Sequence, residues 1–339
     1  MVRVKKTPSK NVSIEDVARL AGVSITTVSR VINKFPTVKE KNRVMVLDAI
    51  KQLKFQPSVF AQRLATGKSN VVALVIPRYE GIFYSFYALE LIRGIGTMCE
   101  ALKLDLLLHL TDSRTSLDLR GSGGIIFADI ITNRNQLTEA LNNHIPSIVI
   151  NNYVQDLEVS CIAIDNVAGA EAAVNYLVSL GHKKIAHISG DVVTQAAAQR
   201  LQGYKQALEK NRIPLDETYI IKTDYSRGQA RSASEKLLQM KNPPTAVFVA
   251  SDSMALEVMA VAKESGKDVP ADLSIVGFDD NPSGLYGPVA LTTVRQPLIK
   301  MAQDSVKELS ILMDSAKKPR IKKILLPAEL IIRESCRSI

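Results

Sequence analysis

From residue 71 onward, short runs of consecutive apolar residues alternate with longer stretches of helix-like composition. We expect strands in the runs VVALVI, LDLLLHL, GGIIFAD, PSIVINN, SCIAIDN, KKIAHISG, AVFVAS and LSIVGFDD. Helices are expected between them, at about 86–102, 133–144, 167–180, 197–211, 227–241 and 252–265. Strands that are apolar throughout and separated by helices are typical of parallel sheets covered on both faces. The pattern predicts two doubly wound α/β lobes, with a ligand cleft beyond the carboxyl ends of their strands.

The first seventy residues predict a small all-α domain instead. Ser13 and Ser24 each precede a short amphipathic segment, as N-cap residues do, and Gly22 separates the two segments. The second segment is expected to bury Val28, Val31 and Ile32. A third helix is expected at about 39–54, with no Ser-type cap at Lys39 and an apolar face of Val44, Leu47, Ile50 and Leu53. Two short helices joined by a Gly turn and supported by a third form the helix-turn-helix pattern.

Positive charge is concentrated in this N-terminal segment. Residues 1–70 contain 14 Lys and Arg against 4 Asp and Glu, a balance of +10, whereas the whole chain has a net charge of +9. The rest of the chain is therefore close to neutral. A basic folded segment attracts phosphate backbones and gives salt-dependent affinity for nucleic acid.

The expected DNA contacts follow from the geometry of the motif. The second helix enters the major groove with its first turn against the base edges. That turn offers Ile25 and Thr26, and Arg30 follows one turn later with a donor fork suited to guanine. Short polar side chains are expected to contact phosphates: Ser24, Thr27, Ser29 and Asn33. The segment is therefore predicted to bind double-stranded DNA.

The run VSIEDVARLAGVSITTVSRVIN resembles the DNA-binding signature of the lactose-repressor/galactose-repressor family of transcription regulators, and the similarity continues through FQPSVFAQRLATGKSN. The resemblance implies that this second stretch is a hinge helix, which folds on the operator and lies in the minor groove beside that of a dimer mate. By position it implies that Leu64 wedges the central base step open, with Ala61 beside it. A helix of about eight residues is marginal alone, and a plain interdomain linker is the alternative.

The later part of the chain resembles the same family, whose sensor core is similar to periplasmic sugar-binding proteins. The matching motifs are AIDNVAGAEAAVNYLVSLGHKKIAHISG, RLQGYKQAL, TAVFVASDSMAL, IVGFDD, LTTVRQP and LLPAELIIRESC. By family position, Arg200 and Asp279 would bind polar groups of a small-molecule effector, and Tyr225 would place a ring against it. Further effector-binding candidates are Phe83 and Tyr87, from an aromatic cluster after the first strand, and Asn151 and Asp252. An interlobe salt bridge is the alternative role for Arg200 and Asp279.

The chain departs from the family pattern in two places. Only the segment SRTSLDLRGSGG separates the second and third strands, so a helix that the family usually has there is expected to be missing or reduced. This leaves the dimer geometry open. Ser251 stands where the family commonly has Asn, which removes an amide from the cleft and leaves the identity of the effector open.

Several other kinds of site are not supported by the residues present. The Gly-rich stretches at 94–96 and 121–124 lack the pattern of a dinucleotide or phosphate loop. His182 and His187 have no acidic ligands nearby in sequence, and three widely spaced cysteines read as small buried side chains. No nucleophile is paired with a base. We therefore expect no metal, no cofactor and no enzymatic activity.

The sequence predicts an allosteric transcription regulator, expected to be a repressor, that binds a near-palindromic operator as a homodimer and senses a carbohydrate. The expected divisions are a helix-turn-helix domain at 1–57, a hinge at 58–70 and an effector-binding and dimerisation domain at 71–339. Within the last, the N-lobe is expected at about 71–164 plus 297–325, and the C-lobe at about 165–296 plus 326–339. No signal peptide or membrane span is recognisable, so we expect a cytoplasmic, nucleoid-associated protein. A solute-binding transport protein and an α/β enzyme are the alternatives.

Overall fold

The computed structural model describes residues 12–33, 35–55, 69–78, 82–112, 121–314 and 320–339. The chain divides into two compact units, Met1–Asn70 and Val71–Ile339. Among the described residues, no helix is long and apolar enough to cross a membrane.

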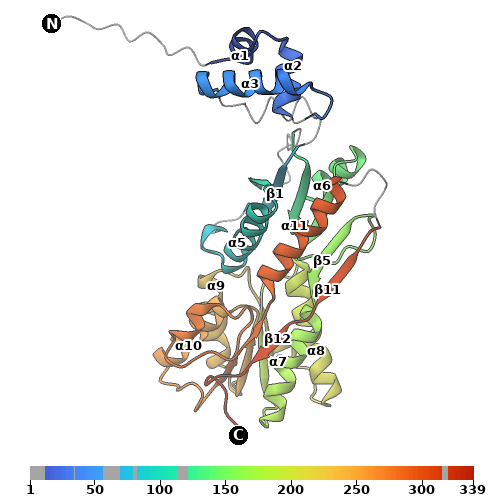
Figure 1. The fold of residues 1–339 in the computed structure, drawn as a ribbon. Helices are drawn as coiled ribbons and strands as arrows, with labels where there is room; N and C mark the ends of the chain where they lie inside the picture. Colours follow the sequence, from blue (N-terminus) through green and yellow to red (C-terminus); the bar gives the residue numbers. More distant parts are fainter. Residues whose placement is uncertain (1–11, 34, 56–68, 79–81, 113–120, 315–319) are drawn as a thin grey trace, which may run out of the picture. The chain divides into compact units, whose positions relative to one another are not determined.

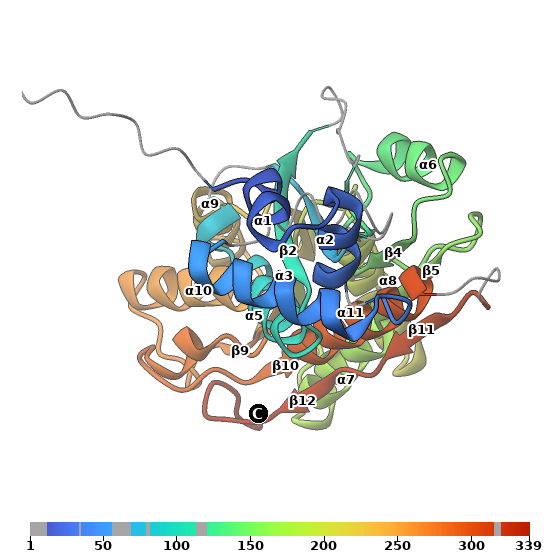
Figure 2. The same ribbon diagram turned by 45° about the horizontal axis from the view of Figure 1, so that its top comes forward.

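The N-terminal unit contains the helices α1 (Ile14–Ala21), α2 (Ile25–Ile32) and α3 (Glu40–Leu53). Ser13 caps α1 in a reciprocal capping box with Asp16, and Ser24 caps α2 by accepting the Thr27 N–H. Gly22 ends α1 in the left-handed conformation, where the absence of a Cβ removes the steric cost. Both α1 and α2 lie against α3 (Figure 2), and the buried side chains of Val17, Val28 and Val46 share one core. The predicted helix-turn-helix is confirmed.

The inward face of α3 differs from the expected one. Val44 and Leu47 are about half exposed, whereas Val46 and Ala49 are buried. The apolar residues of α3 occupy more than one face, so their spacing alone does not identify the buried one. The small side chain of Ala49 lies on the face that contacts the core, where it allows the close approach of α1. As expected, Lys39 precedes α3 without a side-chain cap.

In the second unit, the first sheet has six parallel strands in the order β11-β5-β4-β3-β1-β2. The strands are β1 (Val71–Pro77), β2 (Asp105–Thr111), β3 (Gly124–Ala128), β4 (Ser147–Ile150), β5 (Ser160–Ile164) and β11 (Lys323–Leu326). The helices α5 (Phe86–Ala101) and α11 (Leu298–Asp314) cover one face. The helix α6 (Arg134–Asn142) covers the other, and a short 3₁₀ helix, η1 (Ile82–Tyr84), precedes α5.

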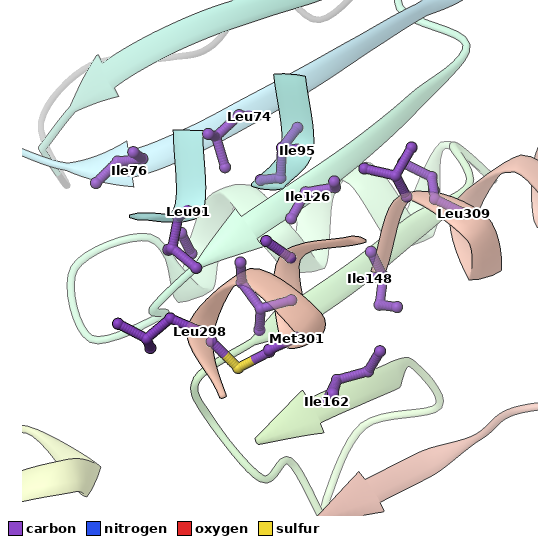
Figure 3. Close-up of a cluster of buried hydrophobic side chains, with 14 of the residues drawn as sticks. Leu74, Ile76, Leu91, Ile95, Ile126, Ile148, Ile162, Leu298, Met301 and Leu309 are labelled. Carbon is purple, nitrogen blue, oxygen red and sulfur yellow. The ribbon is translucent and has the colours of Figure 1, made fainter. Parts of the chain in front are cut away.

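Alternation along the strands explains why both faces of this sheet are apolar. Leu74 and Ile126 point toward α5 and α11, where they meet Leu91, Met301 and Leu309 (Figure 3). The neighbouring residues on β1 and β3 point to the opposite face and pack with Leu137 of α6: Ala73, Val75, Ile125 and Phe127. The sheet is therefore buried on both sides.

The second sheet has four parallel strands in the order β7-β6-β8-β9. These are β6 (Ile185–Ser189), β7 (Ile220–Lys222), β8 (Ala246–Val249) and β9 (Ser274–Val276). One face is covered by α7 (Asn166–Ser179) and α8 (Gln195–Lys210), and the other by α9 (Arg227–Leu238) and α10 (Asp252–Glu264). Short 3₁₀ helices, η2 (Glu217–Tyr219) and η3 (Pro282–Leu285), lie in the connections. The predicted pair of doubly wound sheets is confirmed.

Three elements at the C-terminal end of the chain link the two sheets. The strand β10 (Thr293–Arg295) precedes α11, and β11 runs along β5 at the edge of the first sheet before the chain continues into β12 (Glu329–Ile331) (Figure 1). There β12 pairs antiparallel with β10. The elements α11, β10, β11 and β12 were not predicted from the sequence. Of the three cysteines, Cys99 and Cys161 are buried, while Cys336 is only partly buried.

We predict that Gly203→Ala destabilises the protein by about 1–3 kcal/mol, because a Cβ there would lie 2.3 Å from the Val167 carbonyl oxygen at the α7–α8 contact. The matched control is Gly96→Ala in α5, where nothing lies within 4 Å of the added atom. That change should stabilise by up to ~1 kcal/mol, the usual gain for Ala in a helix. Urea unfolding of both variants measures this, and equal effects at the two positions would contradict the packing described.

Candidate functional site

One face of α2 is free of the N-terminal core. Since Val28 and Val31 are buried against α1 and α3, the opposite face directs Ile25, Thr26 and Arg30 outward. Ile25 is 46% exposed. The Arg30 side chain forms no ion pair or hydrogen bond with any described residue, while its backbone carbonyl accepts from the Phe35 N–H. The residues expected to read bases thus share an exposed surface.

The residues expected to contact phosphates are paired with one another at the two ends of α2. The hydroxyl groups of Ser24 and Thr27 are 2.9 Å apart, and the Asn33 amide donates to the Ser29 hydroxyl at 3.4 Å. These bonds order the first and last turns of the helix. Each hydroxyl oxygen keeps a further hydrogen-bonding position, so contact with phosphate stays a prediction for all four residues.

In the second unit, the residues expected to bind an effector follow the carboxyl ends of strands. Asn151 follows β4, Tyr225 follows β7, and Asp252 and Asp279 follow β8 and β9. Asn151, Tyr225 and Asp279 have positive φ angles of 67°, 67° and 130°. Non-glycine residues pay for this conformation, and such residues cluster at ligand sites.

The guanidinium of Arg200, on α8, is buried in the second sheet's lobe. Its Nε donates to Asn166 Oδ1 at 2.9 Å, and one terminal nitrogen donates to the Ala250 carbonyl at 2.6 Å. Its central carbon lies 3.8 Å above the ring of Phe278. These three contacts fix the charge just beyond the ends of β8 and β9. No salt bridge within 4.0 Å joins Arg200 to Asp279 among the described ion pairs, although the two groups interact electrostatically.

Two carboxyl groups follow the ends of β8 and β9: Asp252 is fully buried and Asp279 is partly buried. Burial raises the pKa of Asp279 to about 6, against the opposing effects of Arg200 and of the Gln296 amide, which donates to Oδ1 at 2.6 Å. Burial and the charge of Asp279 raise the pKa of Asp252 to about 7. Asp252 accepts the Thr293 hydroxyl at 2.5 Å and the Asn281 N–H at 2.7 Å. These bonds tie the chain after β9 to β10, which makes Asp252 a residue that positions Asp279.

The pKa of Tyr225 is affected by charged residues of both lobes. Its ring lies on Gly190, where a Cβ would come within 2.0 Å of the ring. Burial is the largest cause of its raised pKa; Arg200 and a hydrogen bond with the Thr194 side chain lower it, while Asp279 and Asp129 raise it. Asp129 follows β3 in the first sheet. The structure thus brings Arg200, Tyr225 and Asp279 together with a residue of the opposite lobe.

Asp129 and Gln296 were not predicted from the sequence. Asp129 has a φ of 73° and a pKa raised by burial. Gln296 is 7% exposed, and its Oε1 has no hydrogen-bond partner among the described residues. The same holds for Oδ1 of Asn151, which is 8% exposed. The position of Asp129 directly after a predicted strand could have identified it, because other candidates were chosen at the carboxyl ends of strands in the same way.

The two aromatic candidates near the start of α5 are not joined to this group of residues by a described contact. Phe83 is 56% exposed on η1, and Tyr87 packs partly against the core of the first sheet. No described contact joins either to Arg200 or Asp279, and their role stays a prediction. Ser251 caps α10 through the Met254 N–H. Ala61, Leu64 and the segment at 113–120 lie outside the described residues.

Comparison with known proteins identifies the family. Residues 13–58 match the model described as bacterial regulatory proteins, lacI family, and residues 174–336 match a periplasmic binding protein-like domain. The HTH-type transcriptional regulator DegA of Bacillus subtilis (strain 168) is 34% identical over 334 residues, covering 95% of this chain and 97% of DegA. The chain belongs to the lacI family of bacterial regulatory proteins. It is a DNA-binding transcription regulator, and the family consists of such regulators rather than enzymes.

Solved structures of lacI-family proteins share its fold. The lac repressor dimer bound to operator and the anti-inducer ONPF aligns with a TM-score of 0.83 at 27% identity, over 97% of this chain and 100% of that one. The transcriptional regulator CelR in complex with cellobiose aligns with a TM-score of 0.73 at 27% identity, over 96% and 99%. Both alignments include the helix-turn-helix and the two-lobed core.

We predict that the stability difference between Asp279→Asn and the native protein depends on pH. The raised pKa of Asp279 means that its contribution to stability falls as pH rises from about 4 to about 6. The Asn variant lacks this loss, so it should gain roughly 1–2 kcal/mol relative to the native protein between pH 4.5 and 7.5.

Urea unfolding at both pH values measures the effect. His187, whose pKa burial lowers to about 4, titrates in both proteins and cancels from the difference, whereas the pKa of Asp252 is no longer raised by Asp279 in the variant, which adds to the difference in the same direction. The control is Glu139→Gln, which makes the corresponding change at an exposed position of α6. An equal difference at the two pH values for Asp279→Asn would contradict the burial of its charge.

Proposed function

We propose that this protein represses transcription by binding a near-palindromic operator as a homodimer, and that a carbohydrate held between the two lobes of its core controls operator affinity. The proposal rests on the grouping of Arg200, Tyr225 and Asp279 beyond the strand ends, in a chain whose N-terminal unit exposes one face of α2. A donor fork, an aromatic ring and a carboxylate together suit the hydroxyl groups and apolar faces of a sugar.

For DNA recognition we assign base contacts to Ile25, Thr26 and Arg30. Phosphate contacts are assigned to Ser24, Thr27, Ser29 and Asn33. From the sequence we further propose a hinge at 58–70, with Leu64 inserted in the minor groove and Ala61 beside it. Insertion costs a few kcal/mol of unstacking and gains a bent, more extensively contacted site. The lac repressor dimer bound to operator supports binding by two copies of the chain.

For effector control we propose that ligand binding changes the relative positions of the lobes and thereby the spacing of the two DNA-binding units. The CelR–cellobiose complex and a family member with bound ribose support a sugar as the ligand class. A coupling of about 1–3 kcal/mol is typical of such allosteric regulation. The protein would act in the cytoplasm on nucleoid DNA, without catalysis, as expected for a regulator of this family.

Replacing Arg30 with Ala should relax the preference for one base pair in each operator half-site, at a cost of about 1–3 kcal/mol, because a bidentate contact to guanine would be lost. Selection of binding sites from random DNA, followed by titration, measures this. Lys263→Ala removes one exposed charge from α10 and should leave the selected sequence unchanged. An unchanged base preference in the Arg30 variant would remove Arg30 from the base-reading set.

Replacing Arg200 with Met should abolish the response of operator binding to the effector while leaving operator binding by the free protein intact. The reason is that Arg200 is buried in the effector site and lies outside the DNA-binding unit. Operator titrations with and without a sugar found by thermal shift measure this. Lys205→Met, on the same helix, loses only a surface pair with Glu217 and should respond normally. A normal response of the Arg200 variant would contradict the assigned site.

A further inference from the structure

The loop after β3 holds Asp129 rigidly at the sheet edge. The Asp129 N–H donates to the Ile150 carbonyl at 3.2 Å, and the next N–H, of Ile130, donates to Asn152 Oδ1 at 2.8 Å. The Ile131 N–H then donates to Asp129 Oδ1 at 3.1 Å. Three consecutive N–H groups thus fix this loop, in which Asp129 has a φ of 73°, and the third of them binds the Asp129 side chain.

The Asp129 carboxyl group lies at a partly buried position. Among the described residues, Asp129 forms no ion pair with Lys, Arg or His, although burial opposes its charge. Arg200, the cation of the opposite lobe, donates to Asn166 and to the Ala250 carbonyl, and no described bond joins it to Asp129. Asp129 is partly buried, and a partly buried carboxylate without a cation costs stability unless something binds it.

Two unpaired polar atoms, one near the end of β4 and one beside Asp279, are acceptors as well. Gln296 donates its Nε2 to Asp279, which leaves the carbonyl Oε1 of the same amide beside that carboxylate and without a partner. Asn151 follows β4, the strand that pairs with β3, and its buried Oδ1 also lacks a partner in the described part of the chain. Side chains from both lobes therefore present acceptors that only a hydrogen-bond donor would satisfy.

We propose that Asp129 is a further effector-binding residue and that, with Asp279 in the opposite lobe, it restricts the site to ligands that present hydroxyl or amino donors and carry no negative charge. This inference rests on the proposed effector function. It selects neutral sugars and amino sugars, and it excludes sugar phosphates and sugar acids, whose anions would face two carboxylates. The charges of both carboxylates raise the pKa of Tyr225.

The variant Asp129→Asn tests the charge by itself. Asn tolerates positive φ, and its Oδ1 keeps the acceptor position for the Ile131 N–H, so the loop should retain its conformation. Glu139→Gln is the matched control, since it makes the same change at an exposed position of α6. Arg200→Met identifies which ligands bind in the interlobe site.

The probes are matched sets of a neutral sugar, its 2-amino derivative, its 6-phosphate and its acid, built on glucose, galactose, mannose and ribose where each exists. The full-length protein is screened by thermal shift, and each hit is titrated by calorimetry. We expect hits only among neutral and amino sugars. Asp129→Asn should weaken them about tenfold or more, the scale of a charge-assisted hydrogen bond. Glu139→Gln should bind them normally.

A charge-specific readout separates binding from a structural role. The ratio of affinities for a neutral hit and its 6-phosphate should be large in the native protein and smaller in Asp129→Asn, because one repulsive charge has been removed. The inference is overturned if the tightest ligand is an anion, if Asp129→Asn binds as the native protein does, or if no neutral or amino sugar binds. A hit that is lost in Arg200→Met and unchanged in Asp129→Asn leaves the proposed effector site standing and removes Asp129 from it.

Discussion

The buried guanidinium of Arg200 is the charge around which the sensor is organised. It is reached from three separate parts of the second lobe: Asn166 at the start of α7, the carbonyl of Ala250 after β8, and the ring of Phe278 after β9. Removing a cation from water is costly unless hydrogen bonds and nearby charge compensate for it. The contacts that compensate for Arg200 also fix the ends of the strands, so the electrostatics and the shape of the site have a common origin.

The two units of the chain differ in net charge, and the difference matches what each unit binds. The net positive charge lies in the first seventy residues, where Arg30 projects from a helix whose other face forms the small core. The sensor unit is nearly neutral overall and concentrates carboxyl groups at the ends of its strands. A basic unit gains affinity for any DNA through its phosphates, whereas a site rich in acceptors gains selectivity for ligands with donors. One chain can thus bind a polyanion with one unit and discriminate against small anions with the other.

Local sequence was a good guide wherever a structural element is defined by its own residues. The capped helices α1 and α2 and the apolar strands of both sheets follow from caps, turns and periodicity that lie within a few residues of one another. The inward face of α3 did not follow from local sequence. Val44 and Val46 are equally apolar, and only packing in the N-terminal core determines that Val46 is the buried one. The strands β10, β11 and β12 are short, and their partners lie far away in the sequence.

The sequence by itself determined the family, the α/β architecture and the side chains at most strand ends, because each is encoded in a contiguous motif. The tertiary structure decided which of those side chains share a site. It placed Asp129 of the first sheet where its charge raises the pKa of Tyr225, as that of Asp279 does, and it left the Gln296 carbonyl buried without a partner among the described residues. No local pattern reveals such relations. Burial and unpaired hydrogen-bonding groups depend on residues that are brought together only when both sheets have formed and the strands β10, β11 and β12 have linked them.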